Sequence, residues 1–340
     1  MKFLIFRTTF PTTFLATFLT IFLTTLALTQ ASAAVFGTDD RVEAISRPNL
    51  FLQTKSTAMW VSNVYVTPQS APAVGVLETI SLDFPSLAEN QNLCADEKFA
   101  HQPSSPINCT GFLVASDLLV TAGHCSILEG EIAAEANPYC TDFKWMFNFA
   151  ADAFGRLPDL SRFPLSDLVG CKKVLYAIHN PIYHKETDSY TYVKDFSLIQ
   201  LDRKVMDHPI IPIADKPAPA VGDSISLIGY PSGLPAKIVT GSVTETADPN
   251  FFRANMTIFG GNSGSPVFNK KGEVIGILVR QFPESDFVLD PIKNCSRSNV
   301  CDRNGKNCLS NEVVDQPGAQ IQRIDPKLIQ LIRDHLAAMR

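Results

Sequence analysis

After its first thirty residues, the chain has no apolar run long enough to cross a lipid bilayer. It also has no cluster of lysine and arginine, and its 29 basic residues are outnumbered by 34 acidic ones. A nucleic-acid groove needs concentrated positive charge, so we expect no nucleic-acid partner. Strand-like runs do not alternate with long helical patterns, which argues against a parallel α/β sheet.

The start of the chain has the composition of an export leader. Lys2 and Arg7 supply positive charge, Phe10 to Leu28 is apolar with interspersed threonines, and Ala31 to Ala34 offers small residues for cleavage. A retained membrane anchor is the alternative, because the apolar run is near the lower limit for spanning. The threonines and the small residues favour cleavage, so we expect residues 1–34 to be a signal peptide. The mature chain would then be secreted or periplasmic, with no membrane partner.

The eight cysteines all follow this leader, and an even number in an exported chain favours disulfides. We expect one bridge between Cys109 and Cys125, across a hairpin that turns at 115–117. A second bridge is expected between Cys140 and Cys171.

The pairing of the other four cysteines stays open, with room for a link between the two halves of the chain; they are Cys94, Cys295, Cys301 and Cys308. The spacing of the last three is similar to a zinc knuckle, but no histidine lies nearby to complete it. We therefore expect no metal, and we expect no cofactor.

Most of the chain predicts short β-strands. From Val61 onward, β-branched and aromatic runs are separated by Pro, Gly and Asn, which is typical of an all-β barrel or sandwich. Four prolines between 207 and 223 divide two β modules. The final segment differs, because Asp325 as N-cap and Pro326 at the first helical position begin an amphipathic helix. We expect an N-terminal extension and first module over 35–206, a second module over 207–324, and a helix over 325–340.

Two short segments carry the chemistry of a serine hydrolase. Gly260 to Pro266 (GGNSGSP) places Ser263 between glycines, and Thr121 to Cys125 (TAGHC) places His124 after a strand that reads as buried. A hydroxyl needs a neighbouring base to become a nucleophile at neutral pH. Glycine before the serine lets backbone N–H groups turn toward a developing oxyanion. We expect Ser263 and His124 to act together.

The other histidines fit the role of base less well. His335 lies on the final helix, where we expect it to be solvated, and His179 and His184 lie in a polar segment that we expect to be a surface loop. Only His124 sits beside a cysteine whose bridge would fix the segment that carries the base.

Asp195 is the best candidate for the acid that orients the imidazole. It leads directly into the apolar run 196–201, so partial burial is expected, although an acid that only caps a strand end would look the same. Asp202 and Asp188 lie among charged or polar neighbours and are weaker candidates. The order His, Asp, Ser along the chain is one of the known triad solutions.

The segments around His124 (TAGHC), Asp195 (DFSL) and Ser263 (GNSGSP) resemble the three signature blocks of the trypsin/chymotrypsin superfamily. Within it, Gly260 to Phe268 with Glu273 to Ile277 is similar to the bacterial glutamyl-endopeptidase branch. Val35 to Arg41 is similar to the mature start of that branch. These similarities run in patches from residue 35 to the final helix.

The resemblance implies an all-β fold of two six-stranded antiparallel barrels with the active site between them. Ser263 would attack the scissile carbonyl, His124 would move the proton and Asp195 would orient His124. The backbone N–H groups of Gly261 and Ser263 would form the oxyanion hole. Asn262 stands where vertebrate digestive proteases have an aspartate that pairs with a newly cut N-terminus, so activation by that ion pair is not expected.

The resemblance also implies a substrate-binding pocket with three walls, made of Thr257, Ile258 and Phe259, of Leu278, Val279, Arg280 and Gln281, and of Gly318. Thr257 stands where a trypsin carries its aspartate, and Leu278 replaces the histidine with which glutamyl endopeptidases bind glutamate. The Arg280 side chain is expected to point to solvent. We therefore expect a preference for an apolar or medium uncharged residue before the cleaved bond.

The sequence predicts a secreted, monomeric serine endopeptidase acting on polypeptides. A non-catalytic binding protein on the same scaffold is one alternative, although no triad member is missing. A serine esterase is another, although the strand-turn-helix elbow of α/β hydrolases is absent. The insertion 282–316 is either a lid or a cross-linked surface loop.

Overall fold

The computed structural model describes residues 35–69, 78–127, 137–186, 189–215, 217–283, 285–312 and 316–338. The predicted signal peptide and the weak acid candidate Asp188 lie outside these ranges. Within them the chain forms mainly short strands, and the predicted all-β class with two six-stranded barrels is confirmed. No helix among the described residues is long and apolar enough to cross a membrane.

The first barrel closes through strands in the order β10, β11, β7, β6, β3, β8, all antiparallel to their neighbours. The strands are β3 (Thr57–Ser62), β6 (Thr110–Ala115), β7 (Leu118–Thr121), β8 (Phe143–Met146), β10 (Leu168–His184) and β11 (Ser189–Leu201). The β6–β7 hairpin turns at residues 116–117, as the sequence predicted.

The second barrel closes in the order β12, β15, β16, β20, β14, β13, because β12 pairs with both β15 and β13. The strands are β12 (Ser224–Gly229), β13 (Lys237–Glu245), β14 (Phe251–Asn255), β15 (Pro266–Phe268), β16 (Val274–Phe282) and β20 (Gly318–Arg323). The turn between β15 and β16 contains the 269–272 segment.

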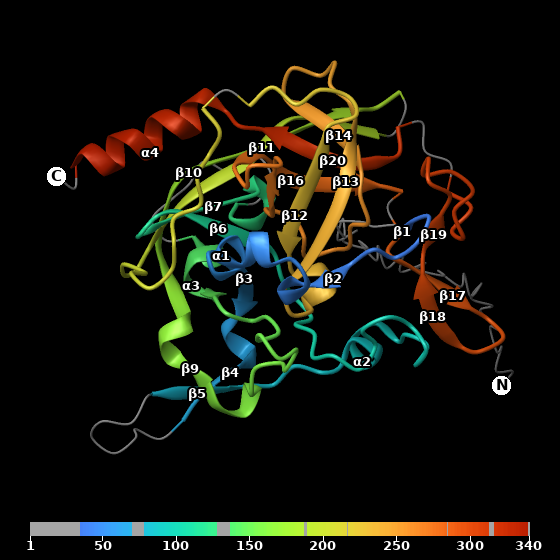
Figure 1. Cartoon of the computed structure of the whole chain (residues 1–340), viewed down its shortest axis with the longest axis horizontal. Helices are drawn as coiled ribbons and strands as arrows, with labels where there is room; N and C mark the ends of the chain where they lie inside the picture. Colours follow the sequence, from blue (N-terminus) through green and yellow to red (C-terminus); the bar gives the residue numbers. More distant parts are fainter. Residues whose placement is uncertain are drawn as a thin grey trace, which may run out of the picture.

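The two barrels share one apolar interface and lie side by side (Figure 1). A single cluster of buried side chains includes Phe112 and Phe196 of the first barrel with Ile228 and Phe268 of the second. Burying this surface between the barrels removes apolar area from water and fixes their orientation. The two barrels therefore share one continuous buried core.

The N-terminal segment crosses to the second barrel and to the insertion. β1 (Val35–Phe36) pairs in parallel with β19 (Val300–Cys301), and β2 (Val42–Glu43) adds to the edge of β13. Figure 1 shows the blue N-terminal strand beside red β19. The insertion also contains a hairpin of β17 (Phe287–Asp290) and β18 (Cys295–Ser298).

Smaller elements lie outside the two barrels. A three-stranded sheet is made of β4 (Val66–Pro68), β5 (Thr79–Leu82) and β9 (Phe163–Pro164). The short helices are α1 (Phe51–Lys55), α2 (Leu87–Gln91) and α3 (Pro138–Thr141).

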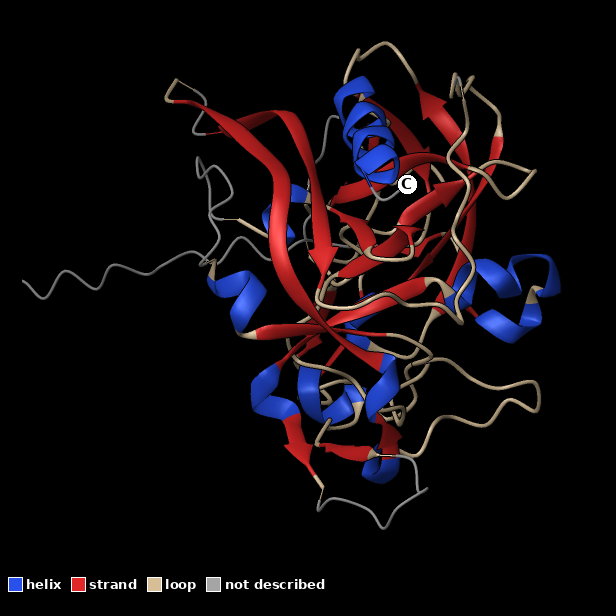
Figure 2. Cartoon of the chain, turned by 90° about the vertical axis from the view of Figure 1, so that its left-hand side faces the viewer, coloured by secondary structure: helices blue, strands red, loops and turns tan. Residues whose placement is uncertain are grey.

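The predicted C-terminal helix is confirmed as α4 (Pro326–Ala338), which lies against the outside of the strands (Figure 2). The Lys327 backbone N–H donates 2.7 Å to Asp325 Oδ1, so the aspartate caps the helix. His335 was expected to be solvated, and that was wrong. Its Nε2 lies 3.0 Å from Asp117 Oδ1, because the helix packs with this face against the β6–β7 turn.

Four disulfides pair all eight cysteines: Cys94–Cys295, Cys109–Cys125, Cys140–Cys171 and Cys301–Cys308. The second and third are the two pairings expected from the sequence. The first ties the segment after α2 to the insertion, 201 residues away.

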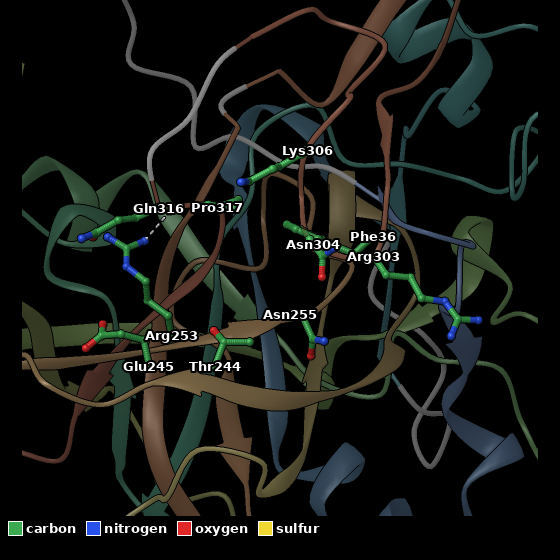
Figure 3. Close-up of a pocket in the computed structure, with 10 residues that line it drawn as sticks. All are labelled: Phe36, Thr244, Glu245, Arg253, Asn255, Arg303, Asn304, Lys306, Gln316 and Pro317. Carbon is green, nitrogen blue, oxygen red and sulfur yellow. Dashed lines mark hydrogen bonds between the residues drawn. The ribbon is translucent and has the colours of Figure 1, made fainter.

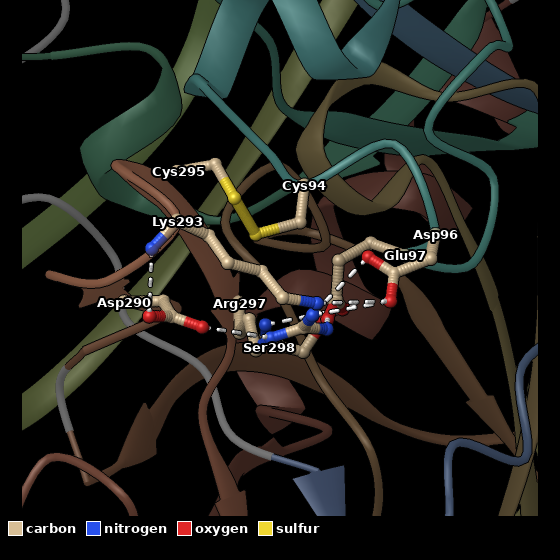
Figure 4. A network of polar contacts seen from close by, with 8 residues as sticks. All are labelled: Cys94, Asp96, Glu97, Asp290, Lys293, Cys295, Arg297 and Ser298. Carbon is tan, nitrogen blue, oxygen red and sulfur yellow. Dashed lines mark hydrogen bonds and ion pairs between the residues drawn. A yellow bond between two sulfur atoms is a disulfide. The ribbon is translucent and has the colours of Figure 1, made fainter.

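Charged groups reinforce the Cys94–Cys295 link. Figure 4 shows Arg297 near the disulfide, with Asp290 on one side of it and Asp96 and Glu97 on the other. Its guanidinium lies 2.9 Å from Glu97 and 3.1 Å from Asp96, and 3.5 Å from Asp290 in its own hairpin. The insertion is therefore cross-linked to the rest of the protein at its β17–β18 hairpin.

Candidate active site

His124 and Asp195 are brought together by a tight turn and a strand. The turn Gly123–Cys125 follows β7, and Asp195 lies within β11. The Asp195 carboxylate accepts from the His124 ring, Nδ1 to Oδ2, at 2.8 Å, and from the His124 backbone N–H, to Oδ1, at 3.0 Å. A side chain at Gly123 would collide with the backbone of Ile178. Glycine is needed there for the turn to approach Asp195 this closely.

Asp195 is fully buried, and its charge is balanced by its neighbours. Burial raises the pKa of this carboxyl, but the attraction and hydrogen bond of His124, with Arg280 and His179, outweigh it. The net pKa lies well below the usual range, so the group stays ionised. A buried carboxylate that holds Nδ1 fixes the imidazole tautomer with Nε2 directed elsewhere.

The segment that carries Ser263 packs against the His124 segment. The Thr110 backbone N–H donates to the Ser263 carbonyl at 2.8 Å, and the same oxygen lies 3.8 Å from the Cys125 sulfur. Gly264 has φ +87°, and a Cβ there would collide with Thr110 and Thr121. Glycine is required both for the left-handed backbone and for this close approach.

No hydrogen bond joins the Ser263 hydroxyl to the His124 ring among the residues that the structure describes. Such contacts are often long without substrate and tighten when it binds. The structure thus brings two of the three expected catalytic side chains into direct contact and packs the backbone of the third beside them.

The expected oxyanion donors are available. Neither the Gly261 nor the Ser263 backbone N–H donates a hydrogen bond to any group within the described ranges. Gly261 has φ +88°, a left-handed backbone conformation in which any residue with a side chain would be strained. Asn262 is completely buried between them, so no charged group stands at this position.

Arg280 makes a contact that the sequence did not predict. Its side chain was expected to point to solvent, and that was wrong: only 12% of it is exposed. Nη2 donates to Asp195 Oδ2 at 3.2 Å, so the same carboxylate oxygen accepts from both Arg280 and His124. The residues are 85 positions apart, and only the packing of β16 against β11 reveals the contact.

His179 and His184 lie in β10, so the prediction of a surface loop was wrong. The segment is polar in sequence, but it forms a strand because it pairs with β11. In this pairing His179 stands opposite Asp195. The His179 and His124 ring centroids are 5.7 Å apart. Burial lowers the pKa of His179, and Asp195 only partly offsets this.

Two polar residues near the site, one buried and one half-buried, were missed. The Asp195 backbone N–H donates to Gln322 Oε1 at 2.9 Å, which fixes β11 against β20. Asp286, in the insertion, accepts from the Gly260 backbone N–H at 2.9 Å. Burial raises the pKa of Asp286 to about 7, although the Gly260 bond and Arg41 act in the opposite direction. No local pattern marks either residue.

The three expected pocket walls are neighbours in the second barrel. Gly318 of β20 pairs with Phe282 at the end of β16, and the 257–259 segment follows β14, which also pairs with β20. Ile258 and Leu278 are buried in the core cluster of this barrel.

The other wall residues are also buried. Val279 packs into a cluster dominated by the first barrel, and Phe259 packs against Val35. The Arg41 guanidinium lies 3.8 Å from the centre of the Phe259 ring. Thr257 and Gln281 are 2% and 1% exposed, so neither is a surface residue. The role of these residues in binding stays a prediction.

A separate pocket of about 380 Å³ lies between β13, β14 and the insertion (Figure 3). Its lining contains none of the expected wall residues. Arg253 donates from Nη1 to the Gln316 carbonyl at 3.0 Å, Lys306 extends across the hollow, and Arg303 points away from it.

Metal binding has little support near the site. The ligand atoms of Cys109, His124 and Cys125 converge, but the two sulfurs are bonded to each other and are not available as thiolates. The ligand atoms of Asp167, Asp207 and His208 also converge. An acidic cluster of this kind is common without an ion.

Residues 109–277 match the family of trypsin-like peptidase domains. The chain is 34% identical over 98 residues to a probable periplasmic serine endoprotease DegP-like of Pseudomonas putida, covering 27% of this chain and 20% of that protein. It is 34% identical over 94 residues to the glutamyl endopeptidase of Staphylococcus aureus, covering 26% of each.

Among solved structures, Glu endopeptidase in complex with MPD matches with 13% identity and a TM-score of 0.45, over 89% of this chain and 99% of that one. The chain spans about a fifth to a quarter of the length of the curated relatives it matches. The relatives from Pseudomonas putida and Staphylococcus aureus are named as an endoprotease and an endopeptidase, respectively.

Proposed function

Because residues 109–277 form a trypsin-like peptidase domain, we propose that the protein is an exported serine endopeptidase that cleaves polypeptides through an acyl-enzyme intermediate. One observation carries the proposal: His124, paired with the buried carboxylate of Asp195, lies beside a glycine-flanked serine, Ser263. The four disulfides support function outside the cytoplasm.

In this mechanism, Ser263 Oγ attacks the scissile carbonyl carbon while His124 Nε2 takes the hydroxyl proton. The C–N bond then breaks as His124 gives this proton to the leaving amine, and water repeats the cycle on the acyl-enzyme. Asp195 stabilises the imidazolium that forms between the two steps. Its burial makes that attraction stronger than it would be in water.

The oxyanion of the tetrahedral intermediate would accept from the N–H groups of Gly261 and Ser263. Both donors are unused within the described residues, which supports this role. One such donor is worth about 3 kcal/mol of barrier in enzymes of this type. The Asn262 side chain between them is completely buried.

A fluorophosphonate probe tests the nucleophile, because it reacts only with an activated serine. We expect the wild-type protein to be labelled at Ser263 and Ser263→Ala to be unlabelled. Ser265→Ala is the matched control, since Ser265 lies in the same buried segment without a catalytic role. A folded wild-type protein that resists labelling would make it a non-catalytic binding protein.

The substrate class is tested with casein and with a simple ester. An endopeptidase hydrolyses both, and Ser263→Ala abolishes both activities. Ester hydrolysis without casein hydrolysis would assign the protein to the esterases instead. A mass spectrum of the exported protein, with Val35 expected at its N-terminus, tests the processing site.

A further inference from the structure

The carboxylate of Asp195 is shared by two positively polarised side chains. Oδ2 accepts from His124 Nδ1 at 2.8 Å and from Arg280 Nη2 at 3.2 Å. Asp195 is completely buried and the Arg280 side chain is 12% exposed, so water screens this pair weakly. The permanent positive charge of Arg280 thus lies beside Asp195. Asp195 is the carboxylate that must stabilise the transient positive charge on His124 during the reaction.

This arrangement has a consequence for His124. A guanidinium remains charged at every working pH, whereas the imidazole becomes charged only during the reaction or in acid. Two cations that share one carboxylate repel each other, so Arg280 makes the imidazolium less favourable. It also holds Oδ2 in place by a charge-assisted bond that does not depend on His124.

On the basis of the proposed function, we propose that Arg280 is a positioning residue: it fixes the Asp195 carboxylate for His124 and adds a permanent positive charge to this pair. The reaction then continues to a lower pH than it would with Asp195 paired to His124 alone. In this role Arg280 acts through Asp195 and not on the reacting atoms.

The other groups that face Asp195 do not provide this effect. From β10, His179 lies opposite it, but burial lowers the pKa of His179 and favours the neutral ring. From β20, Gln322 contacts the Asp195 backbone N–H with a neutral amide. The pKa of Asp195 is itself held well below its usual range, so the carboxylate stays ionised.

Arg253 offers a matched control on the same sheet. Arg253 of β14 and Arg280 of β16 both pair with Gln320 of β20, so the two guanidiniums project from one face on either side of it. Arg253 donates to the Gln316 carbonyl and contacts the Phe282 ring, away from Asp195. Removing the charge of Arg253 tests whether the effect on pH dependence is specific to Arg280 or is produced by any nearby positive charge.

The test is the rate of fluorophosphonate labelling of Ser263 as a function of pH, since it needs no knowledge of the substrate. In Arg280→Met we expect the acidic limb of this profile to move to higher pH by about 0.5 to 1 unit. Arg280→Lys retains the charge, so its limb stays close to that of the wild type. Arg253→Met leaves the limb unmoved.

An unmoved limb in a folded Arg280→Met protein overturns the proposal, as does an equal shift in Arg253→Met. Circular dichroism establishes folding, and a failure of both Arg280 variants to fold would assign the residue a purely structural role, which also overturns it. Absence of labelling in the wild type refutes the proposed function itself. Wild-type labelling with an unmoved limb refutes only the role of Arg280.

Discussion

The backbone N–H of Gly260 donates a 2.9 Å hydrogen bond to the side chain of Asp286, which belongs to the insertion after β16. The Ser232 backbone N–H donates to the Gly260 carbonyl at 2.5 Å, so both polar groups of this residue are engaged. The insertion therefore contacts the segment that carries Ser263. It is more than a loop on the surface, because it supplies one of the groups that fix this segment.

We expect Asp286 to make the stability of the protein depend on pH. Its pKa is raised from 3.8 to about 7 by burial, and Oδ1 has no hydrogen-bond partner within the described ranges. A raised carboxyl pKa means that the folded chain keeps a proton that the unfolded chain loses. The stabilisation is complete below about pH 4 and is lost as the pH rises to about 7.

We expect Asp286→Asn to remove this pH dependence, because the amide oxygen still accepts from Gly260 and carries no charge. In urea unfolding, the wild type should lose about 2 to 3 kcal/mol more than the variant between pH 5 and pH 8. Asp290→Asn, in the same insertion, should retain the wild-type slope, since its neighbours lower the pKa of Asp290. Identical slopes in all three proteins would contradict this assignment.

Asp195→Asn should lower the rate of Ser263 labelling by about 10⁴-fold, because an amide does not hold the imidazole in the required tautomer. The variant also removes the carboxylate charge that Arg280 contacts, so its melting temperature must be measured and the assay run well below it. Asp202→Asn is the control: this residue is exposed and directly follows the same strand. A loss smaller than tenfold would remove Asp195 from the triad.

The Cys109–Cys125 bridge should matter for activity as well as stability, because Cys125 directly follows His124. Replacing both cysteines by alanine should cost about 3 kcal/mol of stability for a loop of 16 residues. We also expect the labelling rate to fall severalfold at a temperature where the protein is folded. Replacing Cys301 and Cys308 should destabilise the insertion and leave the rate unchanged. If the two double replacements lowered the labelling rate equally, the Cys109–Cys125 bridge would not be what holds His124 in place.

Cleavage of a peptide library should show a preference for apolar or medium uncharged residues before the cleaved bond. Thr257 offers no counter-charge for lysine or arginine, and Leu278 none for glutamate. The Arg280 charge is already engaged by Asp195 and so gives little attraction for an acidic side chain. Consistent cleavage after glutamate or arginine would refute this preference.

The sequence predicts those parts of the protein whose signal is local. The β6–β7 hairpin, the helix that begins after Asp325 and the segments around His124 and Ser263 each carry their own turn, capping or glycine pattern. Alternation of strand and turn residues also predicts the all-β class. In each of these cases, the residues that decide the structure are neighbours along the chain.

The contacts that were missed join residues far apart in sequence. His179 reads as part of a polar loop, but β11 supplies the hydrogen bonds that make it part of a strand beside His124. Arg280 reads as a surface residue, but a buried carboxylate 85 positions earlier attracts it inward. A charged side chain becomes buried when its partner is present, and a single sequence does not reveal that partner.

The N-terminal strand β2 has a consequence for how the chain acquires its structure. Glu43 of β2 stands opposite Lys237 of β13, and their side chains form a 3.0 Å ion pair across 194 positions. During synthesis, β2 cannot pair with β13 until about two thirds of the sequence has been made. Such distant pairings are slow to form, so the addition of β2 to the edge of β13 is a late event in folding.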